Sequence, residues 1–179
     1  NLAPKLDYLQ NRLLLDEKSL RKIVTGNPNV LNLNTEDNIG PTLDYLQEIL
    51  LLDDDESLRK LILGAPMILN MSIEDNLQPK LDYLKTELLL DDKSLQKILL
   101  RAPNILGFSI MDNIVPKLEY LQTRLLLDDK SLQRLILRAP IILCLSTKDN
   151  IKPKLDWLQQ RLDLGDAALS RMIQGQPQI

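Results

Sequence analysis

Leucines recur through the chain at spacings that suit a helix with one buried face. In one stretch the stripe consists of Leu77, Leu81, Leu84 and Leu88. Ser72 stands three residues before Asp75, an arrangement close to the capping box that opens many helices. The pattern therefore predicts a helix that begins near Ser72. Because Pro79 removes one backbone hydrogen bond about two turns later, we expect a kink or a fresh start there.

A second helix is predicted directly after the first. Asp91 and Asp92 precede the segment "KSLQ" and supply an N-cap together with negative charge at the positive end of a helix. The apolar pattern stops at "RAP", residues 101–103. The short stretch "PNIL", residues 103–106, leads to the next cap and predicts one tight turn of 3-10 type.

The same pattern of helix caps and prolines recurs about five times along the chain. The first proline of each unit is Pro4, Pro41, Pro79, Pro116 or Pro153, and the second is Pro28, Pro66, Pro103, Pro140 or Pro177. The period is 37 residues, with one unit of 38 whose extra residue lies in the turn "LLDDDESL", Leu51 to Leu58. A period of this size is typical of a solenoid of helix pairs.

These patterns together predict the fold class. We expect an all-α protein, a curved α-solenoid of about five units, each with two longer helices and a short 3-10 turn. Residues 1–179 are expected to form one repeat domain that starts and stops in mid-repeat. Hydrophobic residues make up 44% of the chain and aromatic residues only 3%, so Leu and Ile must fill the core, which favours helices over a sandwich or barrel.

Catalytic chemistry finds little support in the composition. The chain has no His, which excludes His-based triads and His metal ligands, and the lone Cys144 is expected to be a buried or incidental thiol. Helix capping explains the repeated acid pairs. We therefore expect a non-enzymatic monomer without metal, cofactor or small-molecule substrate. No run reaches the roughly 18 apolar residues of a membrane span.

A row of cations offers the candidate binding site. One cation lies six residues before each second proline, and in the middle units the positions one turn away are basic as well. These residues, the basic track, are Lys22, Lys60, Lys93, Lys97, Arg101, Lys130, Arg134, Arg138 and Arg171. At 100° per residue they lie opposite the leucine stripe, so we expect them to face solvent and to contact phosphates.

The alternative for the basic track is a solvated face, partly neutralised by a ladder of carboxylates. That ladder consists of Asp7, Asp44, Asp82, Glu119 and Asp156. Charge is also uneven, since residues 38–75 hold two Lys or Arg against eight Asp or Glu, while residues 76–179 hold fifteen against twelve. Any binding of nucleic acid is therefore expected to rely on the C-terminal half.

Two further ladders follow the first prolines. Aromatic residues stand four positions after each of them, at Tyr8, Tyr45, Tyr83, Tyr120 and Trp157, and such regularity favours packing between units over stacking on a base. Lysines stand one position after the proline at Lys5, Lys80, Lys117 and Lys154, and Thr42 interrupts them. These lysines are expected either to extend the basic groove or to pair with neighbouring carboxylates.

The repeated motifs resemble those of the mitochondrial transcription termination factor (mTERF) family. The resemblance rests on "PKLDYL", the acidic cap, "SLQKILLRAPNIL" and "SIMDN", and it covers nearly the whole chain. It implies a curved solenoid that binds double-stranded DNA, or RNA, in a mitochondrion or plastid and acts in transcription termination or regulation. Two features depart from the family pattern: "LLLDD" stands where family members have Gly in the first turn, and the net charge is −3.

The alternative function, from another class than nucleic-acid binding, is that of a scaffold protein. The near identity of the units also suits an engineered or natural α-solenoid that binds protein, or one that has no nucleic-acid ligand.

Overall fold

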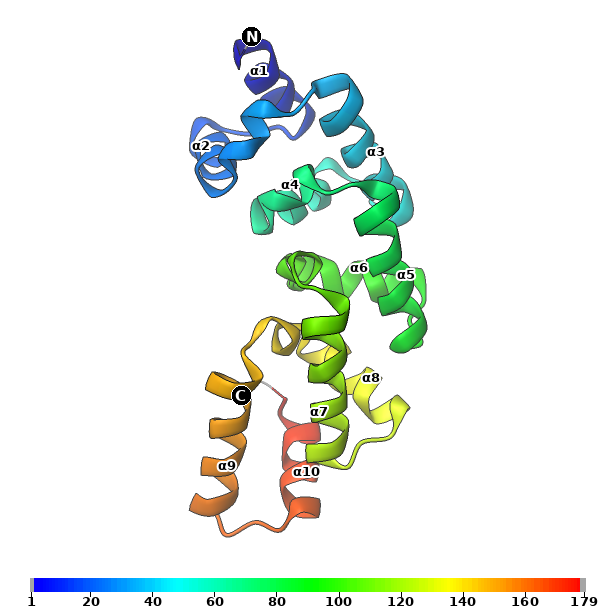
Figure 1. Cartoon of the computed structure of the whole chain (residues 1–179), viewed down its shortest axis with the longest axis vertical. Coiled ribbons are helices and arrows are strands. Elements are labelled where there is room, and N and C mark those ends of the chain that lie inside the picture. Colours follow the sequence, from blue (N-terminus) through cyan, green and yellow to red (C-terminus); the bar gives the residue numbers. More distant parts are fainter. Residues whose placement is uncertain (1, 178–179) are drawn as a thin grey trace.

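The computed structural model describes residues 2–177 and consists of helices and short connections, with no strand in that range. Its α-helices are α1 (Leu2–Arg12), α2 (Glu17–Gly26), α3 (Gly40–Ile49), α4 (Asp55–Gly64), α5 (Gln78–Glu87), α6 (Asp92–Arg101), α7 (Val115–Leu125), α8 (Asp129–Arg138), α9 (Lys152–Arg161) and α10 (Asp166–Gly175). The odd-numbered helix is the first of its unit and the even-numbered helix is the second. The all-α repeat fold predicted from the sequence is confirmed (Figure 1).

A wider helical turn precedes each first helix from α3 onwards. These π-type turns span Thr35–Ile39, Ile73–Leu77, Ile110–Ile114 and Thr147–Ile151. At the start of the second one, the Ser72 side chain accepts a hydrogen bond of 3.1 Å from the backbone N–H of Asp75. The N–H of Leu77 then bonds to the carbonyl five residues back, at Ser72. Pro79 lies in the first turn of α5, where the helix passes without a break from the π-type to the α-type pattern, so a change of helix type takes the place of the expected kink or fresh start.

The second helices begin and end as the pattern predicts. Asp91 accepts a hydrogen bond of 2.8 Å from the N–H of Ser94. The side chain of Ser94, followed by this backbone bond, lowers the pKa of the Asp91 carboxyl. Helix α6 ends at Arg101, and a 3-10 turn follows at once. The 3-10 turns are Pro28–Asn32, Pro66–Asn70, Pro103–Gly107 and Pro140–Cys144.

The turn between the two helices of a unit has a left-handed residue at its centre. The φ angle lies between 49° and 51° at Leu14, Leu51, Leu89, Leu126 and Asp163. This conformation costs an ordinary L-residue roughly 1–2 kcal/mol, which explains why glycine suits the position. Around Leu89 the turn buries the two flanking leucines, Leu88 and Leu90, and leaves the central side chain 60% exposed. The motif "LLLDD" therefore contributes two leucines to the core and one to the surface.

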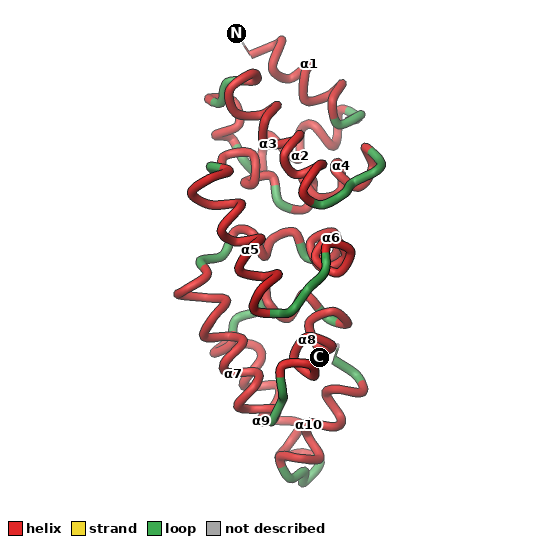
Figure 2. Tube along the Cα trace, turned by 90° about the vertical axis from the view of Figure 1, so that its right-hand side faces the viewer, coloured by secondary structure: helices red, strands yellow, loops and turns green. Residues whose placement is uncertain are grey.

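The units stack into two layers around a continuous core of Leu and Ile. Figure 2 shows α3, α5 and α7 along one side and α4, α6 and α8 along the other. Each of the second helices α2, α4 and α6 contacts the next second helix and its 3-10 turn. In Figure 1 the middle of the molecule, near α5, lies to one side of both ends, and α2 and α4 lie on the inner side of this bend. Within residues 2–177, no helix combines the length and the apolar character needed to cross a bilayer.

Candidate nucleic-acid interface

All nine residues of the basic track are exposed, and all lie on second helices. Helices α6 and α8 carry three of them each, and α2, α4 and α10 carry one each. On α6, Lys97 faces solvent while Leu95, Ile98 and Leu99 are buried in the core. The structure therefore places the basic track on one layer of the solenoid, as the helical phase predicts.

The carboxylate ladder does not neutralise this track. Among the described residues, the ion pairs involve Arg12, Lys85 and Arg124 as the cations and no member of the basic track. Arg12 of α1 pairs with Asp44 of α3 at 3.1 Å, and Arg124 of α7 pairs with Asp156 of α9 at 3.2 Å. Asp44 and Asp156 link neighbouring first helices instead, so these ion pairs do not support the alternative of a neutralised face.

Two arginines of the track also contact the next unit. Arg101 donates to the Leu137 carbonyl at 3.3 Å, and Arg138 donates to the carbonyls of Gln174 at 2.6 Å and Gly175 at 2.9 Å. These carbonyls belong to the C-terminal ends of α8 and α10, where backbone acceptors lack helical partners and the helix dipole is negative. Arg101 and Arg138 thus have a stacking role that the sequence pattern did not reveal.

A cavity of about 440 Å³ lies on the track between α8 and α10. Its lining includes Arg134, Arg138, Ser131 and the Gln174 side chain, but no carboxylate. Arg134 donates to the Ser131 hydroxyl at 3.0 Å, which holds its guanidinium beside this cavity. Two guanidinium groups in a cavity whose lining holds no carboxylate form the kind of surface that a phosphate oxygen prefers.

Three of the four lysines that follow the first prolines neither extend the groove nor pair with a carboxylate, and this corrects both alternatives expected from the sequence. The Nζ atoms of three of these lysines donate to the carbonyls of 3-10 turns: Lys5 to Leu31 at 2.5 Å, Lys80 to Leu106 at 2.7 Å and Lys117 to Leu143 at 2.5 Å. Lys117 is only 3% exposed, and burial lowers its pKa. Each lysine therefore connects a first helix to the 3-10 turn of the same unit. Lys154 is exposed.

The aromatic ladder packs against the core between units. Tyr8, Tyr45, Tyr83 and Tyr120 are half-buried. Burial, followed by the carboxylate Asp82 of the next unit, raises the pKa of Tyr45. Trp157 is 61% exposed and differs from the others. The half-buried tyrosines agree with the structural role predicted for this ladder.

The single thiol has the character of a core residue. Cys144 is half-buried at the end of a 3-10 turn, and burial raises its pKa. A raised pKa leaves little thiolate at neutral pH, which agrees with the expected incidental thiol.

Comparison with known proteins gives one match and one negative finding. The model of the mTERF family matches residues 1–179, the whole chain. No curated protein matches.

Proposed function

The chain belongs to the mTERF family, and from this membership we propose that it binds double-stranded DNA along the basic track without catalysing a reaction. The family is one of nucleic-acid-binding repeat proteins related to transcription. The observation that carries the proposal is the basic track, whose nine cations are exposed on five successive second helices and form no ion pair with a described carboxylate.

The geometry suits contact with a phosphate backbone. Stacked helices lie about 8–10 Å apart, so successive cations meet backbone charges every few base pairs. Phosphate contacts position a protein on a duplex without reading its sequence. The cavity beside Arg134 and Arg138 supplies a place where a phosphate oxygen reaches two guanidinium groups. The process that the family suggests is transcription termination or regulation, in a mitochondrion or plastid.

Binding of protein is the second candidate, and two observations favour it. The second unit is strongly acidic, with eight Asp or Glu against two Lys or Arg in residues 38–75. In addition, four turns expose a leucine side chain, at Leu14, Leu51, Leu89 and Leu126. Such a surface suits a scaffold for an apolar and basic protein partner.

The deciding experiment measures binding of the chain to duplex DNA, duplex RNA and single strands at increasing salt. We expect duplex DNA to bind most tightly. If five cations contact phosphates, log K should fall with log salt at a slope of roughly −4 to −5. Tighter binding to duplex RNA would reassign the ligand. No duplex binding at low salt would contradict the proposal and favour the protein scaffold.

A further inference from the structure

The units can be compared with one another at one position of the first helix, the residue that follows the first proline. In the first, third and fourth units, this position is a lysine whose ammonium donates to a carbonyl of the 3-10 turn, at 2.5–2.7 Å. In the second unit Thr42 takes the position, and the corresponding carbonyl belongs to Leu69. Thr42 is 3% exposed and Leu69 is 1% exposed. Among the described residues, neither the Thr42 hydroxyl nor the Leu69 carbonyl takes part in a hydrogen bond.

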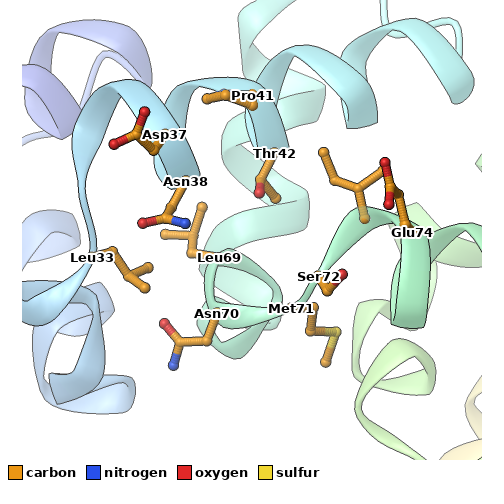
Figure 3. A pocket seen from close by; sticks show the side chains of 11 residues that line it. Leu33, Asp37, Asn38, Pro41, Thr42, Leu69, Asn70, Met71, Ser72 and Glu74 are labelled. Carbon is orange, nitrogen blue, oxygen red and sulfur yellow. The ribbon is translucent and has the colours of Figure 1, made fainter.

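A cavity of about 410 Å³, the Thr42 cavity, lies at this place. Figure 3 shows Thr42 with its hydroxyl directed into the space between Leu69 and Ser72. Asp37 and Glu74 lie on opposite sides of the same space. Because the Thr42 hydroxyl lies at the wall of this cavity and neither it nor the Leu69 carbonyl has a partner among the described residues, a ligand that pairs with both gains two hydrogen bonds.

The charge of the Thr42 cavity differs from that of its counterparts. Its lining holds two carboxylates and no Lys or Arg. In the first unit the corresponding cavity is lined by Lys5 and Glu36, and in the fourth unit by Lys117, Lys148 and Asp112. Neither Asp37 nor Glu74 is in an ion pair with a described residue. The second unit thus lacks the cation but keeps the acceptors.

We propose that the Thr42 cavity binds a primary ammonium group that donates to the Leu69 carbonyl and the Thr42 hydroxyl, with Asp37 and Glu74 balancing its charge. The ammonium takes the place that the lysine Nζ occupies in the other units. An alkyl chain of about four carbons replaces the missing lysine stem and lies against Pro41 and Met71, which line the cavity. The group comes from a free alkylamine or from the lysine side chain of a peptide. None of the basic track lines this cavity, so the proposal is independent of DNA binding.

The test uses two probes, n-butylammonium and a capped single lysine, titrated into the full ¹⁵N-labelled chain at constant ionic strength. We expect saturable shifts of backbone amides at residues 37–40, 42 and 69–74, and none from tetramethylammonium, which has no N–H to donate. Tighter binding of the capped lysine identifies a peptide as the source, and tighter binding of n-butylammonium identifies a free amine. Shifts that stay linear with concentration, or that tetramethylammonium reproduces, would overturn the proposal.

Two variants and one matched control locate the site. Thr42→Lys supplies the ammonium within the chain and should abolish the saturable shifts. Thr123→Lys adds the same charge at an exposed position of α7 and should leave them unchanged. Glu74→Gln alters an exposed side chain without hydrogen bonds, so it keeps the fold and should weaken binding severalfold. Unchanged affinity in both Thr42→Lys and Glu74→Gln would place the ammonium elsewhere.

Discussion

The second and fourth units have the same order of helices, caps and turns but opposite charge. Residues 38–75 carry two Lys or Arg against eight Asp or Glu, whereas residues 113–149 carry six against four. Yet both units have an aspartate N-cap, a left-handed leucine and a 3-10 turn that begins with proline. The difference teaches that caps, prolines and apolar positions specify the solenoid. Surface charge is then free to vary from unit to unit, and with it the ligand.

The largest expected effect tests the shared scaffold. Leu61 of the second unit and Leu135 of the fourth occupy the same position and are 0% and 2% exposed. Replacing either by Ala should lower the free energy of unfolding by about 3 kcal/mol, because each change leaves a cavity in the core. Urea unfolding followed by circular dichroism measures the loss. A loss in one unit several times larger than in the other would show that the units do not share one scaffold.

The next effect tests the difference in charge. Replacing Lys130 and Arg134 together by Gln removes two proposed phosphate contacts, so the affinity for duplex DNA should fall about 50-fold near 0.1 M salt. The salt slope should flatten by about two, equally for all duplex sequences. Fluorescence anisotropy measures both quantities.

The matched control for this pair is Lys60→Gln in the acidic second unit, where the affinity should fall by no more than about twofold because nearby carboxylates repel phosphates. Arg138 is left unchanged, since its contacts with α10 would mix stacking with binding. An unchanged salt slope in the double variant would contradict the assignment of the track.

The sequence predicts what depends on local periodicity, and it does so well here. Two prolines and two caps per unit mark where the helices begin, and the 100° phase places Lys97 opposite Leu95. The partners of long side chains escape prediction because they depend on how the elements stack. Lys117 finds its carbonyl 26 residues away, and Arg138 finds its carbonyls 36 and 37 residues away. A polar residue such as Thr42 gives no local sign that it will be buried.

A smaller effect tests the left-handed turn, which is common to both units. Leu51 and Leu126 have φ angles of 49° and 51°, and their side chains are 52% and 65% exposed. Replacing either by Gly should raise the free energy of unfolding by about 0.5–1 kcal/mol, because relief of the strained backbone exceeds the entropy cost of Gly. Thermal melting measures the gain. Leu127→Gly, at a buried position with no left-handed angle, should destabilise the protein. A lower free energy of unfolding for Leu126→Gly would show that the backbone is not strained at Leu126.

The smallest effect tests an ionic contact that only one of the two units makes. Arg124 of the fourth unit pairs with Asp156 and Asp166 of the fifth, and Ile49 stands at the corresponding place in the second unit. The two aspartates are 50% and 64% exposed, so solvent screens the pairs and Arg124→Ile should cost less than about 1 kcal/mol. The loss should shrink further at high salt, which thermal melting at two salt concentrations detects.

The reverse exchange, Ile49→Arg, places a guanidinium near Asp82 and Asp92, the counterparts of the two aspartates in the third unit. The gain in the free energy of unfolding from Ile49→Arg should be smaller than the loss from Arg124→Ile, because Lys85 already pairs with Asp92 at 2.5 Å. A large, salt-independent change from either exchange would mean that the charges help to specify the stack. The second and fourth units would then differ in scaffold as well as in ligand.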